Sequence, residues 1–387
     1  MSQEEMDFVH TGPGTIAGRY LRKFWQPVCV GGDLKPGQAL PVRLMSENFT
    51  LYRGESGTPY VVAFRCAHRG AQLSTGWVEG DDIRCRYHGW KYDGCGRCIE
   101  QPGEEESFTA KVGIKSYPAR EHLGLIFVYL GEGEPPPLRR FPEFEKPGLI
   151  SVGPPEVWPC NYFNRIDNAC DVGHVTFTHR ESLQRRAGSP KYFTVPTLAA
   201  EETEYGIRTA VVRTEGPTDY FHFHMPNINQ APPSGRVETG AQNAANLRAH
   251  RLFWRVPIDD EHCVSYVVSW LPLTGDAARD FEARRVDLRS SMAASPNETA
   301  AAILKGKMRL KDVDKDASPY YFFWIEDYVV QVGQGTIADR SDERLGRIDV
   351  GPILLRKIWQ RELRALAEGR GLKQWKSPEK PLVETER

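Results

Sequence analysis

Two closely spaced pairs of cysteine and histidine constrain this chain more than any other feature. Cys66 and His68 form a Cys-x-His pair, and after sixteen intervening residues Cys85 and His88 form a Cys-x-x-His pair. Thiolate and imidazole are ligands for both iron and zinc, and two such pairs on neighbouring loops can surround a small inorganic centre. We therefore expect the four side chains to converge and to hold a metal centre.

Zinc and an iron–sulfur cluster are the two candidates for this centre. A structural zinc site of the Cys2His2 type is the simpler alternative, but a zinc finger places its paired histidines together at the end of one helix. Here each pair mixes cysteine with histidine and lies between glycine-rich and strand-like segments. This arrangement favours a cluster held by two β-loops.

The residues after each histidine extend the pattern. His68 is followed by Arg-Gly-Ala-Gln-Leu, and His88 by Gly-Trp-Lys-Tyr-Asp-Gly. The two loops resemble those of the Rieske [2Fe–2S] domain, which read C-x-H-R-G and C-x-x-H-G-W-x-Y-D. The resemblance implies that Cys66 and Cys85 hold one iron of the cluster, and that His68 and His88 hold the other. Neutral imidazoles in place of two thiolates raise the reduction potential of such a cluster.

Composition excludes several classes of partner. The chain has 387 residues, a formal net charge of -1 and 26% charged residues, which gives no case for nucleic acid or a membrane surface. No apolar run approaches the ~18 residues of a spanning helix. The segment from Met1 to Asp7 is acidic and lacks the pattern of a secretion signal. We expect a cytoplasmic protein.

The eight cysteines are not expected to form a disulfide framework in a chain of this length and kind. Cys95 and Cys98 form a Cys-x-x-Cys pair that could suggest a second metal or a redox dithiol. We interpret them as free thiols in a turn, because no further Cys or His pair completes a site nearby.

A second motif follows the Gly133–Pro137 stretch, whose three prolines indicate a linker. Asp171, His174 and His179 can lie near one face of a helix and its continuation. Two imidazoles and one carboxylate form the site of non-haem Fe(II) oxygenases, with open positions for O2 and substrate. The alternative is a pair of hydrogen-bonded core histidines, with Asp171 as a helix cap.

The two motifs in this order resemble the α (terminal oxygenase) subunit of the Rieske-type mononuclear non-haem iron oxygenases. The pattern Asn168-x-x-Asp171-x-x-His174-x-x-x-x-His179 resembles the iron-site motif of that family, and the resemblance covers nearly the whole chain. It implies that His174 and His179 are iron ligands. It also implies a third ligand, a carboxylate on a late helix.

We assign the third ligand to Asp327, because the segment around it resembles the Glu-Asp helix of the family. Glu326 is the competing carboxylate. Three further acidic residues nearby belong to a charged alternation typical of solvated surface, namely Asp312, Asp314 and Asp316.

The resemblance gives Asp171 a role other than ligation. In the family this aspartate joins one iron histidine to one cluster histidine of the neighbouring subunit in a ring-shaped trimer. On that basis Asp171 would join His174 of its own chain to His88 of the next. A carboxylate that accepts an imidazole N–H fixes the tautomer and orientation of a metal-bound histidine. Asn168 is expected to support this arrangement.

The predicted fold class is α+β. It comprises an N-terminal helical segment (1–24) packed on the catalytic domain, an all-β Rieske domain (25–134), and a catalytic domain (135–387). The last should be a helix-grip-like antiparallel sheet with helices that carry the iron. Alternating β-rich segments at 39–44, 49–53 and 59–63 support the first domain.

The substrate is constrained least by the sequence. His222 and His224 share one face of an alternating strand, and together with Asn227 they could orient a polar or anionic substrate. Surface or core histidines are the alternative. A substrate pocket is expected beside the iron, walled in part by a loop at 230–246. Arg248, Arg251 and Arg255 could pair with a carboxylate. The late Gly346–Pro352 stretch resembles the phthalate dioxygenase-like branch, whose members act on aromatic acids.

We therefore predict a terminal oxygenase component that uses O2 to hydroxylate a small aromatic substrate, and the family resemblance implies that this substrate is an aromatic acid. The resemblance implies a [2Fe–2S] cluster, a mononuclear Fe(II), electrons from NAD(P)H through a separate reductase or ferredoxin, and a homotrimer. Oxidative O- or N-demethylation is the alternative, since it uses the same irons. A Rieske electron-transfer protein without a working iron is the rival from a different class.

Overall fold

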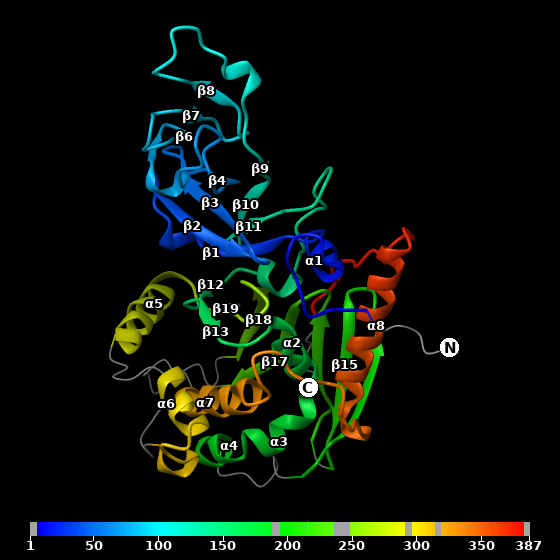
Figure 1. Ribbon diagram of the computed structural model, residues 1–387. Coiled ribbons are helices and arrows are strands. Elements are labelled where there is room, and N and C mark those ends of the chain that lie inside the picture. Colours follow the sequence, from blue (N-terminus) through cyan, green and yellow to red (C-terminus); the bar gives the residue numbers. More distant parts are fainter. Residues whose placement is uncertain are drawn as a thin grey trace.

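The computed structural model describes residues 6–187, 194–214, 216–235, 248–290, 296–313 and 319–382. A smaller β-rich part stands at one end of the molecule, and a larger part built on one broad sheet with helices forms the other (Figure 1). Within the described residues, no helix combines the length and apolar character that a bilayer crossing requires.

The smaller part consists of short antiparallel strands in three sheets. One sheet has the order β1-β11-β10, from β1 (Gln26–Val30), β11 (Leu125–Val128) and β10 (Ala119–His122). The second has the order β2-β3-β4-β9, from β2 (Ala39–Leu44), β3 (Glu47–Arg53), β4 (Pro59–Ala63) and β9 (Ser116–Tyr117). The third has the order β5-β6-β7-β8, from β5 (Trp77–Glu79), β6 (Asp82–Arg84), β7 (Lys91–Tyr92) and β8 (Cys98–Glu100).

The larger part is organised by an eight-stranded antiparallel sheet with the order β12-β19-β18-β17-β16-β15-β14, and β13 also pairs with β19. Its strands are β12 (Leu149–Val152), β13 (Glu156–Trp158), β14 (Thr197–Glu202), β15 (Gly206–Val212), β16 (Asp219–His224), β17 (Ile228–Gly235), β18 (Arg248–Pro257) and β19 (Cys263–Leu271).

Helices pack around this sheet (Figure 1). They are α1 (Ile16–Leu21), α2 (Tyr162–Cys170), α3 (Val175–Thr178), α4 (Arg180–Ala187), α5 (Gly275–Ser290), α6 (Pro296–Leu304), α7 (Pro319–Val332) and α8 (Val350–Ala367). The buried residues of α8 include Leu355, Ile358, Trp359 and Leu363, at the spacing of one helical face. This face packs Trp359 against Tyr20 of α1, with ring centroids 5.1 Å apart, and so joins the N-terminal helix to the larger part.

The α+β prediction is confirmed, with a β-rich part followed by an antiparallel sheet with helices. The expected loop at 230–246 differs in part. Residues 230–235 belong to β17, which pairs with β18, and residues 236–246 lie outside the described residues. The pairing register shifts between Ala231 and Ser234, which accommodates the two intervening prolines because a proline cannot donate to a strand ladder. The two prolines led to the prediction of a loop where the structure has the strand β17.

Candidate metal centres

Two loops of matching backbone geometry carry the Cys/His pairs. The first follows β4, and the second joins β6 to β7. In each loop the cysteine carbonyl accepts a hydrogen bond from a glycine four residues later: Gly70 N–H to Cys66 O is 2.9 Å, and Gly89 N–H to Cys85 O is 3.0 Å. Both glycines have φ of +74°, a conformation that favours glycine. The glycines of the sequence pattern therefore serve the turn, which brings each histidine back beside its cysteine.

The two cysteines lie beside each other, and so do the two histidines. Cys66 and Cys85 are buried, and burial together with the neighbouring Cys66 thiol raises the pKa of Cys85. The rings of His68 and His88 lie with their centroids 4.6 Å apart. His68 Nδ1 is buried without a hydrogen-bond partner among the described residues, and His88 is exposed. Two thiols and two imidazoles at the tip of a β-loop pair fit a histidine-ligated iron–sulfur cluster.

Two aromatic residues support this site. The Tyr92 hydroxyl lies 3.1 Å from Cys66 Sγ and accepts a hydrogen bond of 3.1 Å from Ala67 N–H. Trp90 stacks on His68, with centroids 4.5 Å apart and planes at 7°. Our sequence reasoning used both residues as family markers without assigning them a contact. Hydrogen bonds to cluster sulfurs adjust the reduction potential, so Tyr92 belongs functionally to the centre.

His174, His179 and Asp327 form a second centre, which we call the triad. Their ligating atoms all lie within 4.8 Å of one another. Asp327 Oδ1 is 3.7 Å from His174 Nε2 and 3.4 Å from His179 Nε2. His174 ends a short 3-10 helix (Val172–His174), His179 follows α3, and Asp327 lies on α7. His179 Nε2 is buried and has no hydrogen-bond partner among the described residues, which is the state of a nitrogen that holds a metal.

Electrostatics within the triad suit a divalent metal. Burial lowers the pKa of His174, which keeps its ring neutral and able to ligate. Burial alone would raise the pKa of Asp327, but the hydrogen bond and charge of His179 outweigh it and hold that pKa well below its usual range. Burial alone would lower the pKa of His179, but the Asp327 and Glu326 carboxylates outweigh it and raise that pKa. A site with two imidazoles and one ionised carboxylate leaves coordination positions open, as in the non-haem Fe(II) oxygenases.

Glu326 binds the far side of one triad histidine. Its Oε2 lies 3.0 Å from His179 Nδ1, and its Oε1 accepts a hydrogen bond of 3.2 Å from Ser182 N–H. Glu326 contacts His179 Nδ1, whereas Asp327 lies beside His179 Nε2. The two carboxylates that the sequence offered as the third ligand therefore contact opposite sides of the His179 ring. A carboxylate on the second nitrogen orients a metal-bound histidine and raises its basicity.

Known proteins share these features. The profile of the Rieske [2Fe-2S] domain matches residues 24–118. The 5,5'-dehydrodivanillate O-demethylase oxygenase subunit of Sphingobium sp. (strain NBRC 103272 / SYK-6) is 29% identical over 95% of this chain and 82% of its own length. The phthalate 4,5-dioxygenase oxygenase subunit of Pseudomonas putida is 28% identical over 91% of this chain and 83% of its own. The chain therefore contains a Rieske [2Fe–2S] domain and is similar over nearly its whole length to the oxygenase subunits of Rieske non-haem iron oxygenases.

Solved structures show the same fold. Pseudomonas putida CBB5 NdmA with caffeine superposes with a TM-score of 0.67 at 21% identity, covering 96% of this chain and 99% of that one. Dicamba monooxygenase bound to dicamba gives a TM-score of 0.60 at 17% identity, covering 90% and 99%. The Rieske match and the likeness to oxygenase subunits agree with the two centres described above, one for a [2Fe–2S] cluster and one for a mononuclear iron, and subunits of this kind receive electrons from a separate reductase.

A polar chain behind the triad holds the Asp327 carboxylate of this oxygenase subunit. Gln331, one turn further along α7, donates from Nε2 to Asp327 Oδ1 at 2.9 Å and accepts from Arg165 Nη1 at 2.5 Å. The Arg165 guanidinium lies over the Trp158 ring at 3.5 Å. Sequence reasoning missed Gln331, although its spacing of four residues from Asp327 is a usable signal because such residues are neighbours on a helix.

Asp171 contacts His174 mainly through the backbone. Its Oδ1 accepts a hydrogen bond of 3.2 Å from His174 N–H, and its carbonyl oxygen contacts His174 Nδ1. The expected contact between the Asp171 carboxylate and the imidazole is therefore replaced by the carbonyl of the same residue. Burial raises the pKa of the half-buried carboxyl group, with His174 acting in the opposite direction. Asn168 accepts a hydrogen bond of 3.1 Å from Asp171 N–H through its own carbonyl.

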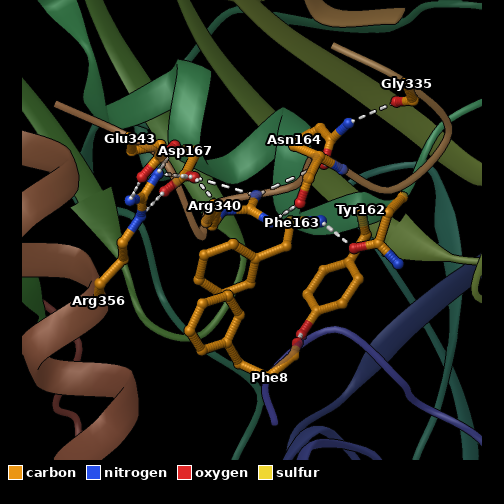
Figure 2. A network of polar contacts seen from close by, with 11 residues as sticks. Phe8, Tyr162, Phe163, Asn164, Asp167, Gly335, Arg340, Glu343 and Arg356 are labelled. Atoms are coloured by element: carbon orange, nitrogen blue, oxygen red, sulfur yellow. Dashed lines mark hydrogen bonds and ion pairs between the residues drawn. The ribbon is translucent and has the colours of Figure 1, made fainter. Parts of the chain in front are cut away.

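The helix that leads to Asp171 is anchored by a network around Asp167 (Figure 2). Arg356 of α8 donates to both Asp167 oxygens, at 3.1 and 2.6 Å, and Arg340 donates to Oδ2 at 3.1 Å. Arg356 also pairs with Glu343. Figure 2 shows Arg340 beside the stacked rings of Phe8 and Phe163. Asp167 thus ties α2 to α8 and to the segment after α7, which fixes the end of α2 from which Asp171 and His174 follow.

The residues expected to contact substrate lie elsewhere. His222 Nδ1 is 2.8 Å from the Tyr205 hydroxyl, and His224 Nε2 is 2.9 Å from Gln230 Oε1. In the sheet His224 lies opposite Ile228, and Ile228 opposite Trp254, so these side chains share one face. Trp254 packs on Phe127 of β11, which identifies this face as the one toward the smaller part.

Arg255, the next residue of β18, points to the other face and interacts electrostatically with Asp327. The structure therefore does not bring His222 and His224 to the triad. Asn227 is also held elsewhere, because its amide donates at 2.9 Å to both Gln26 Oε1 and the Arg255 carbonyl. The expected common face of the two histidines is present, but it is the face away from Asp327.

We expect Glu326→Gln to weaken binding of the mononuclear iron by about 10- to 100-fold, because a neutral amide supports the metal-bound form of His179 less than a carboxylate does. The measurement is iron retained during titration with a chelator. Glu132→Gln, an exposed carboxylate outside both centres, is the matched control. Equal iron retention in both variants would contradict the orienting role of Glu326.

Proposed function

We propose that this subunit is the terminal oxygenase that hydroxylates a small aromatic acid. In this proposal His174, His179 and Asp327 hold the iron, and Cys66, His68, Cys85 and His88 hold the cluster. The observation that carries the iron assignment is the triad itself: three ligating atoms within 4.8 Å, one of them the buried and unpartnered Nε2 of His179.

The protein residues divide the remaining tasks. When bound, the cluster supplies electrons one at a time and the ferrous ion supplies O2 activation. Glu326 fixes the tautomer of His179 so that Nε2 faces the metal, and Gln331 holds Asp327 Oδ1 by a hydrogen bond of 2.9 Å. Asp171 is proposed as a positioning residue that sets His174 and faces the neighbouring subunit. Asn168 supports the turn that presents Asp171.

The charge near the triad favours an anionic substrate. Arg165 and Arg255 are both buried, and Asp327 interacts electrostatically with each of them. Burial lowers the pKa of Arg255 to about 9, and its Nη1 donates to Ser265 Oγ at 2.5 Å. Buried cations without a full counter-charge attract an anion. Relatives named for phthalate, 3-chlorobenzoate and phenoxybenzoate suggest that this anion is an aromatic carboxylate.

Oxidative demethylation of a methoxy aromatic compound is the second candidate function. It is favoured by the likeness to an O-demethylase subunit over 95% of the chain. Both reactions use the same two metal centres, so the difference between them depends on which substrate carbon lies beside the iron.

We also propose a ring-shaped homotrimer in the cytoplasm. Figure 1 supports the assembly. The strands β6 and β7 flank one cluster loop and lie at one end of the protomer, whereas α3 and α7 flank the triad and lie at the opposite end. Within one protomer the two centres are thus far apart, and His88 is exposed. A neighbouring subunit would bring its His88 to Asp171. We retain the division into an N-terminal segment (1–24), a Rieske domain (25–134) and a catalytic domain (135–387).

The test is a panel of benzoates, phthalates and methoxybenzoates given to the reduced enzyme under O2. We expect ring-hydroxylated acids as products, and weaker turnover of the corresponding neutral amides because they lack the charge that attracts the arginines. Products are identified by mass spectrometry, and formaldehyde is assayed in the same samples. Formaldehyde without ring hydroxylation would replace hydroxylation by demethylation. Absence of any product from fully iron-loaded enzyme would overturn the aromatic-acid assignment.

A further inference from the structure

A cavity of about 180 Å³ lies on the face of the large sheet away from the triad. Its walls come from segments far apart in the chain, including the linker, the turn between β16 and β17, and the C-terminal residues 372–377. Aromatic side chains form much of the lining, among them Trp25, Phe127, Phe141 and Trp254. Trp254 and Phe127 belong to the two different parts of the molecule, so the cavity lies at their junction.

The charged side chains that line the cavity are positive. Lys23, Arg139 and Lys373 line the cavity, and in the part of the chain that the structure describes no aspartate or glutamate does. Lys373 is already compensated, because its Nζ lies 2.7 Å from Glu202 Oε1, and Lys23 is exposed. Arg139 is the cation that lacks compensation: among the described residues no carboxylate forms an ion pair with it, and its Nη1 makes only a long contact of 3.4 Å to the Tyr205 carbonyl.

Two further features agree with an uncompensated positive charge at this site. Burial lowers the pKa of Arg139 to about 10, because no negative charge offsets the loss of water around the guanidinium. His122 also lines the cavity, and its buried Nε2 has no hydrogen-bond partner among the described residues. A guanidinium offers a planar pair of N–H donors that matches a carboxylate.

The size of the cavity restricts the ligand. A cavity of about 150 Å³ in another protein holds one benzene molecule, so this cavity has room for a single substituted ring. Aromatic walls favour a flat apolar body, and Arg139 favours one acidic group at its edge.

We propose that this cavity is a second ligand site, separate from the triad, that binds a small aromatic monocarboxylate through Arg139. A ligand held there contacts both parts of the molecule and the C-terminal segment. The proposal extends beyond the proposed reaction at the iron, because it requires no turnover.

The test is titration of the iron-loaded protein with benzoate by calorimetry, repeated with benzamide, its neutral isostere. We expect benzoate to bind wild type about tenfold or more tightly than it binds Arg139→Gln, since a charge-assisted bond is lost. Arg140→Gln is the matched control, because the neighbouring Arg140 is exposed and pairs with Glu145 at 2.6 Å. It should bind benzoate as wild type does. Benzamide should bind wild type and Arg139→Gln equally weakly.

Binding beside the iron is separated from binding in the cavity by the Arg255→Gln variant, which removes one of the two cations proposed to attract the substrate carboxylate near the triad. We expect this variant to keep its benzoate site at Arg139. Benzoate binding that survives in Arg139→Gln but disappears in Arg255→Gln would overturn the proposal, as would no binding to wild type. If Arg139→Gln does not fold, the benzamide comparison on wild type decides the question, because benzamide binding as tight as benzoate binding would overturn the proposal. A failure of the substrate panel would leave this result unaffected, because the titration uses resting protein.

Discussion

Asp327→Asn is expected to abolish binding of the mononuclear iron and product formation while the cluster stays intact. The substitution keeps the shape of the side chain and removes the negative charge beside His174 Nε2 and His179 Nε2, at 3.7 and 3.4 Å. Two neutral imidazoles alone hold Fe(II) weakly, since carboxylate supplies the hard anionic ligand of such sites. Iron content should fall from about three to about two per protomer, the two of the cluster.

The measurement combines iron analysis with electron paramagnetic resonance of the reduced cluster. The cluster spectrum should match wild type, because Cys66, His68, Cys85 and His88 lie in the other part of the molecule. Glu326→Gln is the comparison that separates the two adjacent carboxylates. If Asp327→Asn retained all its iron and Glu326→Gln lost it, the ligand would be Glu326, and the contact of 3.0 Å between Glu326 and His179 Nδ1 would need another explanation.

The metal centres were predictable from sequence to the extent that their residues are close in the chain. Cys66 and His68, like Cys85 and His88, are placed by tight loops whose glycines are visible in the sequence. His174 and His179 lie within one short helical region. Asp327 required the family pattern, because α7 reaches the triad only through tertiary packing. Glu326 and Asp327 are about 100° apart on a helix, so only the packing of α7 decides which one faces the metal.

The predicted substrate contacts do not lie at the triad, because a pattern within one strand does not determine which face of the sheet lies toward it. Side chains alternate between the two faces along a strand, and this alternation correctly predicted that His222 and His224 share one face of β16. It could not say which face lies toward the triad, since alternation along one strand does not show what packs on either face. The decisive information is the packing of Trp254 on Phe127 and the interaction of Arg255 with Asp327, both of which involve segments distant in sequence.

Asp171→Asn is expected to leave both metal centres loaded and to slow electron transfer between them by about 100-fold, the upper end of what loss of a metal-orienting carboxylate costs. Asparagine still caps the short helix, because its side-chain oxygen can accept from His174 N–H as Asp171 Oδ1 does at 3.2 Å. The negative charge proposed to face His88 of the next subunit is lost. Stopped-flow oxidation of the pre-reduced cluster in single turnover measures the rate.

The matched control is Asp349→Asn, which removes another negative charge that acts on Asp171 but leaves the proposed bridge in place. It should transfer electrons at nearly the wild-type rate. An equal loss of electron-transfer rate in both variants would mean that the loss comes from the change in charge and not from the bridge.

Rings assembled from two different variant chains make the test sharper. A chain with Cys85→Ser lacks the cluster, and a chain with Asp327→Asn lacks the iron, so a mixed ring turns over only if electrons cross between subunits. In that ring Asp171→Asn should block turnover when it is placed in the Cys85→Ser chain, which holds the working iron, and should have little effect in the other. Equal effects in both chains would contradict a bridge built from Asp171 and the neighbouring His88.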